Sequence, residues 1–174
     1  GFGNDSHNII EYLVMNDMEK HPSRAKMDDA MTRNTAGYTP ILEGFSAWLR
    51  DSGIKIVASE LMVYHAAHKY AGTIDLVGIK QNDPLSLVVI DVKTGGVFDE
   101  AAMQVSAYAT ALEYLTNDPV SEAWVLQLPR ERPDKWDADK LYQVHKVESI
   151  PTYHEAFIDA MNLRERLKGE AWTT

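Results

Sequence analysis

Two aspartates and one lysine stand near the ends of two strands that the sequence predicts as neighbours. Asp75 lies in the run YAGTIDLVGIK, and Asp91 and Lys93 follow the apolar run LSLVVI. Hard carboxylate oxygens suit Mg²⁺ or Mn²⁺, and such an ion neutralises phosphate charge and lowers the pKa of a bound water. Lys93 comes two residues after Asp91 and so projects to the same face of the strand. There it could orient or deprotonate the water, or stabilise the transition state. This combination suits cleavage of a phosphodiester bond.

The turn signal at residues 81–84 predicts a hairpin that joins the two strands. By count, this hairpin alone does not set Asp75 beside Asp91, so we expect it to bend or splay if both acids bind one ion. Gly72 and the pair Gly95-Gly96 leave room for the backbone to approach a ligand closely. Further along, Gln104 and Tyr108 are one helical turn apart and share a helix face.

The elements that must position these residues alternate in type along the chain. Helical apolar spacing predicts helices over residues 3–20, 39–52, 99–115 and 151–168. Runs rich in β-branched residues predict strands over residues 54–64, 70–80, 85–92, 123–128 and 141–147. The run LSLVVI is nearly all apolar, so its strand should be central and covered on both faces. The order predicts an α/β fold: a mixed sheet with helices on its faces.

Length and composition bound the class of protein. A chain of 174 residues is expected to form one domain, residues 1–174. With no cysteine, disulfides and iron–sulfur clusters are excluded, which fits an intracellular protein. No signal peptide or membrane-length apolar run is visible. A net charge of −9 argues against a passive nucleic-acid coat but not against a nuclease, whose acidic centre meets phosphate through a cation. The chain opens at Gly1-Phe2 without a methionine, so we expect that an upstream part was cut away or left out.

Each signal also has an ordinary structural interpretation. An Asp-x-Lys sequence at a strand end is usually a solvated edge or a salt bridge. A Gln and a Tyr at the spacing of Gln104 and Tyr108 usually form a polar seam along a helix. A histidine on an apolar helix face, such as His7, is usually a hydrogen-bonded core histidine. Glu60 is most simply an outward residue on an edge strand. The order and spacing of the signals together carry the functional interpretation.

That order resembles the RecB-like branch of the PD-(D/E)XK nuclease superfamily. The family pattern has a histidine near a helix start, a Gly-x-x-Asp strand, an Asp-x-Lys strand and a Gln-x-x-x-Tyr helix. Its counterparts in this sequence are Gly3…His7, Gly72-Thr73-Ile74-Asp75, Asp91-Val92-Lys93 and Gln104…Tyr108. The resemblance implies a restriction-endonuclease-like core.

The resemblance also implies roles for individual residues. His7, Asp75, Asp91 and the backbone carbonyl of Val92 would be metal ligands, and Lys93 would be the catalytic lysine. Gln104 and Tyr108 would line the site near DNA, and Glu60 matches an acid that often opens the first strand. Phage-type and mitochondrial-type exonucleases are the most similar members, which implies a Mg²⁺- or Mn²⁺-dependent DNA exonuclease in recombination, repair or replication.

Basic residues for DNA contact are sparse. Arg130 and Arg132 follow the strand that ends at residue 128, with Trp136 close behind; Arg grips phosphate and Trp stacks on unpaired bases. Tyr70 and Lys69 are similar candidates, and the alternative is a solvated loop. A homo-oligomer or a partner protein could supply further basic surface. Two other functions stay open: a non-catalytic nucleic-acid-binding or assembly module with this fold, and a structure-specific endonuclease.

Overall fold

The computed structural model describes residues 39–97, 99–131 and 141–168. The predicted helix over residues 3–20 lies outside these ranges. The described elements are α3 (Thr39–Ser52), β1 (Ile54–His65), β2 (Tyr70–Lys80), β3 (Asp83–Lys93), α4 (Asp99–Thr116), β4 (Val120–Gln127), β5 (Gln143–Lys146) and α5 (Ile150–Leu167). Most bounds fall within two residues of the predicted ones. The largest difference is at the start of β4, where pairing with β3 extends the strand back from residue 123 to Val120.

The five strands form one mixed sheet in the order β1-β2-β3-β4-β5. The pairs β1–β2, β2–β3 and β4–β5 are antiparallel, whereas β3 and β4 are parallel and are joined through α4. A parallel pair needs such a crossover connection, and a helix usually supplies it. The predicted mixed α/β sheet is therefore confirmed.

The central strand is β3, as the run LSLVVI predicts. Val88, Val89 and Ile90 are all 0 % exposed, because helices cover both faces of the sheet. Full burial of each such side chain stabilises the fold by about 1.5–3 kcal/mol. The acidic end of β3 is thus anchored in the most buried part of the molecule.

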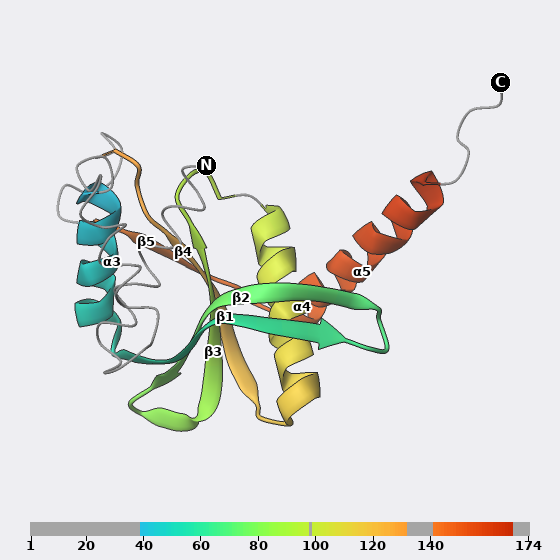
Figure 1. The fold of residues 1–174 in the computed structure, drawn as a ribbon, viewed down its shortest axis with the longest axis horizontal. Helices are drawn as coiled ribbons and strands as arrows, with labels where there is room; N and C mark the ends of the chain where they lie inside the picture. The colour runs from blue at the N-terminus through green and yellow to red at the C-terminus, as the bar shows by residue number, and fades with distance from the viewer. Residues whose placement is uncertain (1–38, 98, 132–140, 169–174) are drawn as a thin grey trace, which may run out of the picture.

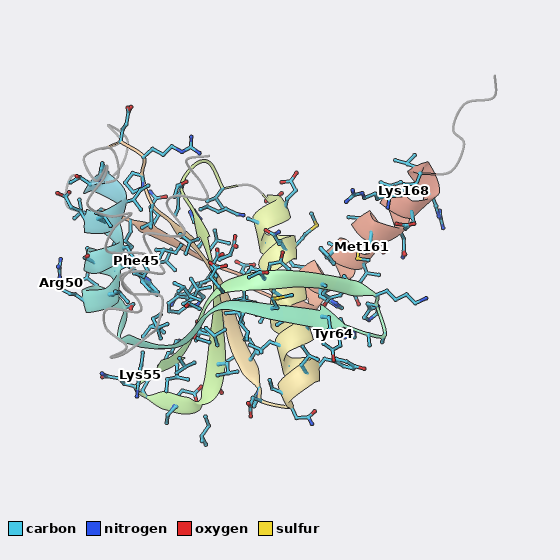
Figure 2. The ribbon with its side chains drawn as sticks, in the orientation of Figure 1. Phe45, Arg50, Lys55, Tyr64, Met161 and Lys168 are labelled. Carbon is cyan, nitrogen blue, oxygen red and sulfur yellow. The ribbon has the colours of Figure 1, made fainter. Side chains whose placement is uncertain are left out.

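Successive residues of β3 contribute to two separate cores. Val88, Ile90 and Val92 pack with Phe45 and Trp48 of α3, on one face of the sheet. Figure 1 shows α3 on this side and α4 with α5 on the other, and Figure 2 places Phe45 on the side of α3 that faces the sheet. Val89 packs on the α4 side. Because side chains alternate along a strand, Asp91 and Lys93 project to the same side as Val89.

The helix α4 lies close to the sheet because its buried face is made mainly of small residues. Ala107, Ala109 and Ala111 are at most 1 % exposed. The helix α5 packs on α4 through its first half; its N-cap is Ser149, whose side chain accepts from the Thr152 N–H. The second half projects from the body, with Met161 nearer the sheet and Lys168 at the far end (Figures 1 and 2). None of the helices in the described ranges is long and apolar enough to span a membrane.

The hairpin between β2 and β3 has an irregular register near its turn. Lys80 pairs with Asp83, but Ile79 pairs with Leu87, so residues 84–86 are extra on β3. Without this irregularity Asp75 would lie opposite Val88. With it, the pairs Val77↔Val89 and Leu76↔Ile90 make Asp91 the next position opposite Asp75. A regular hairpin therefore does not set the two acids side by side, as expected, and the irregularity at residues 84–86 aligns them.

Candidate active site

Asp75 is held against the end of β3. The Val92 N–H donates to Asp75 Oδ2 at 2.7 Å. Burial and, as a smaller effect, the nearby charge of Asp91 together raise the pKa of Asp75 to about 8, although the hydrogen bond from Val92 acts in the opposite direction. Two carboxylates this close repel each other when both are ionised. The pair is therefore costly without a cation.

Asp91 and Lys93 form the second part of the site. Asp91 is 6 % exposed, and Lys93 Nζ lies 3.1 Å from its Oδ2. The lysine side chain is 35 % exposed. Oδ2 itself is buried and has no hydrogen-bond donor in line with it among the described residues, so the ammonium is close but poorly directed. A carboxylate oxygen in this state can bind a cation or accept a further hydrogen bond.

Gln104 and Tyr108 on α4 extend the side-chain hydrogen bonds from Lys93 away from the two acids. Lys93 Nζ donates to Gln104 Oε1 at 3.4 Å, and Gln104 Nε2 donates to the Tyr108 hydroxyl at 3.0 Å. Burial raises the pKa of Tyr108, and the hydrogen bond from Gln104 partly offsets this. The strand end and the helix are thus joined through side chains at the site.

Gly72 serves the site in a way that the sequence does not reveal. A Cβ added at Gly72 would collide with the ring of Tyr108. The glycine makes room for this aromatic ring, and the expectation that it makes room for a ligand is corrected. Around Gly95, in contrast, no atom of the described residues beyond its chain neighbours lies within 4 Å of an added Cβ.

The donors at this edge of the sheet fit a hard divalent cation. Besides the two carboxylates, the Val92 carbonyl faces the Asp75 side. The Lys93 carbonyl accepts from Leu128 N–H on the β4 side at 2.8 Å, and successive carbonyls alternate along a strand. Oxygen donors of this kind suit Mg²⁺ or Mn²⁺. Among the described residues no three acidic or histidine side chains converge on one point, and His7 lies outside them.

Glu60 occupies the same row of the sheet on β1. The pairs Ser59↔Leu76 and Leu61↔Ile74 place it opposite Asp75, and its charge makes a small contribution to the raised pKa of Asp75. Its backbone φ of 48° interrupts the regular strand, and its side chain is exposed. Glu60 is therefore an exposed residue of an edge strand beside Asp75, and its role at the site stays a prediction.

The residues predicted to contact DNA lie in different surroundings. Arg130 lies at the same sheet edge as Lys93, and its Nε donates to the Thr94 carbonyl at 3.0 Å. The prediction that Tyr70 contacts DNA is corrected. Tyr70 is 8 % exposed, and its hydroxyl donates to the Ala107 carbonyl at 2.7 Å, so its side chain is part of the core. Arg132 and Trp136 lie outside the described residues.

Gln127 is a positioning residue that sequence analysis missed. It pairs with Lys93 in the parallel register, and its Nε2 donates to the Gly95 carbonyl at 2.8 Å. His145 holds the other end of the amide, with 2.9 Å between its Nε2 and Gln127 Oε1. These contacts fix the loop that follows Lys93. No linear signal could have found them, because they depend on the β3–β4 register.

Comparison with known proteins gives the class to which this fold and site belong. The sequence pattern of the PD-(D/E)XK nuclease superfamily matches residues 3–173, so the chain belongs to that superfamily. Its resemblance to the superfamily is confirmed; its place in the RecB-like branch stays a prediction.

The comparison with solved structures shows only the fold, and the comparison with curated proteins finds no match. The crystal structure of a "Putative exonuclease" from Eubacterium rectale matches with a TM-score of 0.53 and 10 % identity, over 92 % of this chain and 65 % of that one. This chain thus spans just under two thirds of that protein, and the likeness shows the fold alone.

Proposed function

We propose that this chain is a divalent-metal-dependent DNA exonuclease of the RecB-like branch, acting in recombination, repair or replication. One observation carries the proposal: the register places Asp75, in the middle of β2, opposite Asp91, near the end of β3, and Lys93 Nζ lies 3.1 Å from Asp91. Membership of a nuclease superfamily supports the reaction type. DNA as substrate and the need for an end are our inferences.

The acidic residues and one carbonyl would hold the metal. Asp75, Asp91 and the Val92 carbonyl would bind it, and the resemblance adds His7 as a fourth ligand. A bound Mg²⁺ or Mn²⁺ would act as a Lewis acid and neutralise phosphate charge. Asp75 must be ionised to bind it, and a cation bound there favours the ionised form.

Lys93 is placed to stabilise charge that develops on the phosphate. Its ammonium is held between Asp91 Oδ2 at 3.1 Å and Gln104 Oε1 at 3.4 Å, and its side chain is 35 % exposed, so a phosphate can approach it. A preorganised cation of this kind lowers the barrier because it requires no rearrangement during the reaction. Gln104, which is itself bonded to Tyr108, would keep the ammonium close to the acids. Arg130, and Arg132 beyond the described residues, would contact the backbone of the strand.

The need for a DNA end follows from charge. With a net charge of −9 the chain has little basic surface to clamp a long duplex, which takes many phosphate contacts. Passing one strand by the metal site needs only a short basic path and stacking side chains.

The test compares linear and closed DNA. Linear DNA labelled at one end is incubated with the protein and Mn²⁺ beside covalently closed circular single strands and duplexes. We expect progressive release of mono- or short oligonucleotides from the linear DNA, with the circles intact. Rapid cutting of the circles would instead support the structure-specific endonuclease. No cutting of any DNA, with binding retained, would support the non-catalytic module.

A further inference from the structure

A pocket of about 480 Å³ opens beside the candidate active site, between the start of α4 and the middle of α5. Its volume lies within the range of about 300–1,000 Å³ that is common for small-ligand sites. Two of its lining residues, Lys93 and Gln104, also belong to the acidic site. A substrate whose phosphate reaches Lys93 therefore brings its neighbouring group to this pocket.

The walls of the pocket are mainly apolar. Ala101, Met103, Phe157 and Ala160 line it, and the polar lining side chains are Lys93, Glu100 and Gln104. Phe157 is held in place by Tyr70, with 5.0 Å between ring centroids and 69° between ring planes. This edge contact gives the pocket a rigid aromatic wall, which is the usual platform for a stacked base.

We propose that this pocket takes one unpaired nucleobase of the strand being cut, next to the phosphate held by Lys93. The inference rests on the proposed function and narrows the substrate to DNA with a single-stranded or frayed end. The apolar faces of a base would contact Phe157 and Met103, and its polar edge would form a hydrogen bond with Gln104. The bonds of Gln104 to Lys93 and Tyr108 use one of its two amide N–H groups, so the other can donate to the base.

The charges around the pocket support a base rather than a phosphate. Glu100 is one of the lining residues and carries a negative charge, whereas the ammonium of Lys93 lies near Asp91. Glu100 would repel a phosphate from the pocket and leave it at Lys93, while a neutral base pays no such cost. A paired base cannot enter, because it must first leave its stack and its partner.

The test measures binding of single strands that differ in one base. Two oligonucleotides are identical except that one terminal residue carries a base in the first and is abasic in the second, with each end tried in turn. Ca²⁺ replaces Mn²⁺, and gel analysis verifies that the strands stay intact. We expect wild-type protein to bind the base-bearing strand about tenfold more tightly at one of the two ends, as expected for one stacked base.

Two variants separate the pocket from general packing. In Phe157→Ala the ratio of the two Kd values should fall to within about twofold of one, with the abasic strand bound as in wild type. Met161→Ala is the matched control, because Met161 packs on the same core from the same helix but does not line the pocket. Its ratio should stay at the wild-type value.

Either of two outcomes would overturn the inference: a wild-type ratio near one at both ends, or an equal loss of affinity for both strands in Phe157→Ala. A protein that cuts linear DNA in Mn²⁺ but shows a ratio of one refutes the base pocket and leaves the proposed function intact. A protein that shows the ratio but never cuts DNA refutes the nuclease and leaves the base pocket intact.

Discussion

Asp75 and Asp91 make the ion-free protein less stable than it would be with one charge fewer. Asp75 has a usual pKa of 3.8 and a folded pKa of about 8, so the folded state binds more protons between these values. Stability therefore falls as pH rises through this window. In EDTA at pH 8 we expect Asp75→Asn to melt at least about 2 °C higher than wild type, the shift that ~1 kcal/mol produces in a chain of this size.

The same substitution should remove the response to metal. Wild-type protein should melt at a higher temperature when Mn²⁺ is added, because the ion binds the folded state alone; Asp75→Asn should not. Asp159→Asn, on the exposed side of α5, is the control and should respond as wild type does. A melting temperature of the wild type that ignores Mn²⁺ would contradict the metal site.

Lys93 should behave differently from the two acids. We expect Lys93→Ala to keep its Mn²⁺ affinity but to cut DNA about 10²–10³-fold more slowly, because the ammonium serves the transition state more than the ground state. Titration calorimetry with Mn²⁺ and single-turnover cleavage measure the two properties separately. A loss of Mn²⁺ affinity as large as that of Asp91→Asn would refute this role.

At the scale of elements, Gly72 couples β2 to α4. In Gly72→Ala the new methyl group must displace the ring of Tyr108, which holds Gln104. Overpacking of this kind costs about 1–3 kcal/mol, so we expect a lower free energy of unfolding in urea together with slower cleavage. Gly95→Ala is the matched control, because its added Cβ meets no atom within 4 Å in the described part of the chain, apart from its chain neighbours. Equal stability of the two variants would contradict the packing role.

Three histidines join the β1–β2 hairpin to α5. The rings of His65 and His68 are 4.7 Å apart, those of His68 and His154 are 5.2 Å apart, and His154 Nε2 lies 3.1 Å from the Tyr70 hydroxyl. Burial lowers the pKa of His65 and of His154, and the charge of His68 lowers both further. Glu155 raises the pKa of His154 only as a smaller effect.

These shifts make stability depend on pH. The unfolded chain binds protons near the usual pKa of 6.5, and the folded chain does so only at lower pH. The stability that the neutral histidines contribute is complete above pH 6.5 and is lost as pH falls through the folded values. In an Asp75→Asn background, which removes the opposite pH dependence of Asp75 in this window, we expect the melting temperature to drop between pH 7.5 and 5.5, and to drop less when His68→Gln is added. His145→Gln, on β5, is the control; an equal drop in both variants would contradict the coupling.

The sequence predicted the elements better than their alignment. Apolar runs and turn residues were enough for the sheet, the central position of β3 and the helices α3, α4 and α5, because each depends on local periodicity. The register of β2 on β3 was not predictable, since the extra residues 84–86 carry no pattern that fixes a pairing. The partner of Gly72 and the contacts of Gln127 depend on this tertiary alignment. The metal role of His7 stays a prediction from resemblance.

For the whole molecule, the charge balance limits how DNA can be held. If Lys93, Arg130 and Arg132 are the main phosphate contacts, log K for a single strand should fall with log salt at a slope of about −2. Fluorescence anisotropy between 50 and 200 mM KCl measures this slope, and Arg130→Ala should make it shallower by about 0.7. A slope steeper than about −5 would contradict a short basic path and indicate a larger surface, such as an oligomer provides.

The most direct measurement of the central claim is the rate of nucleotide release from an end-labelled linear strand by wild type and by Asp91→Asn. We predict release by the wild type in Mn²⁺, none in EDTA, and a rate at least about 10³-fold lower in the variant. A loss of that size corresponds to about 4 kcal/mol of transition-state stabilisation. Circular dichroism must show that the variant is folded. Release at the wild-type rate by a folded Asp91→Asn, or release by the wild type in EDTA, would contradict the account.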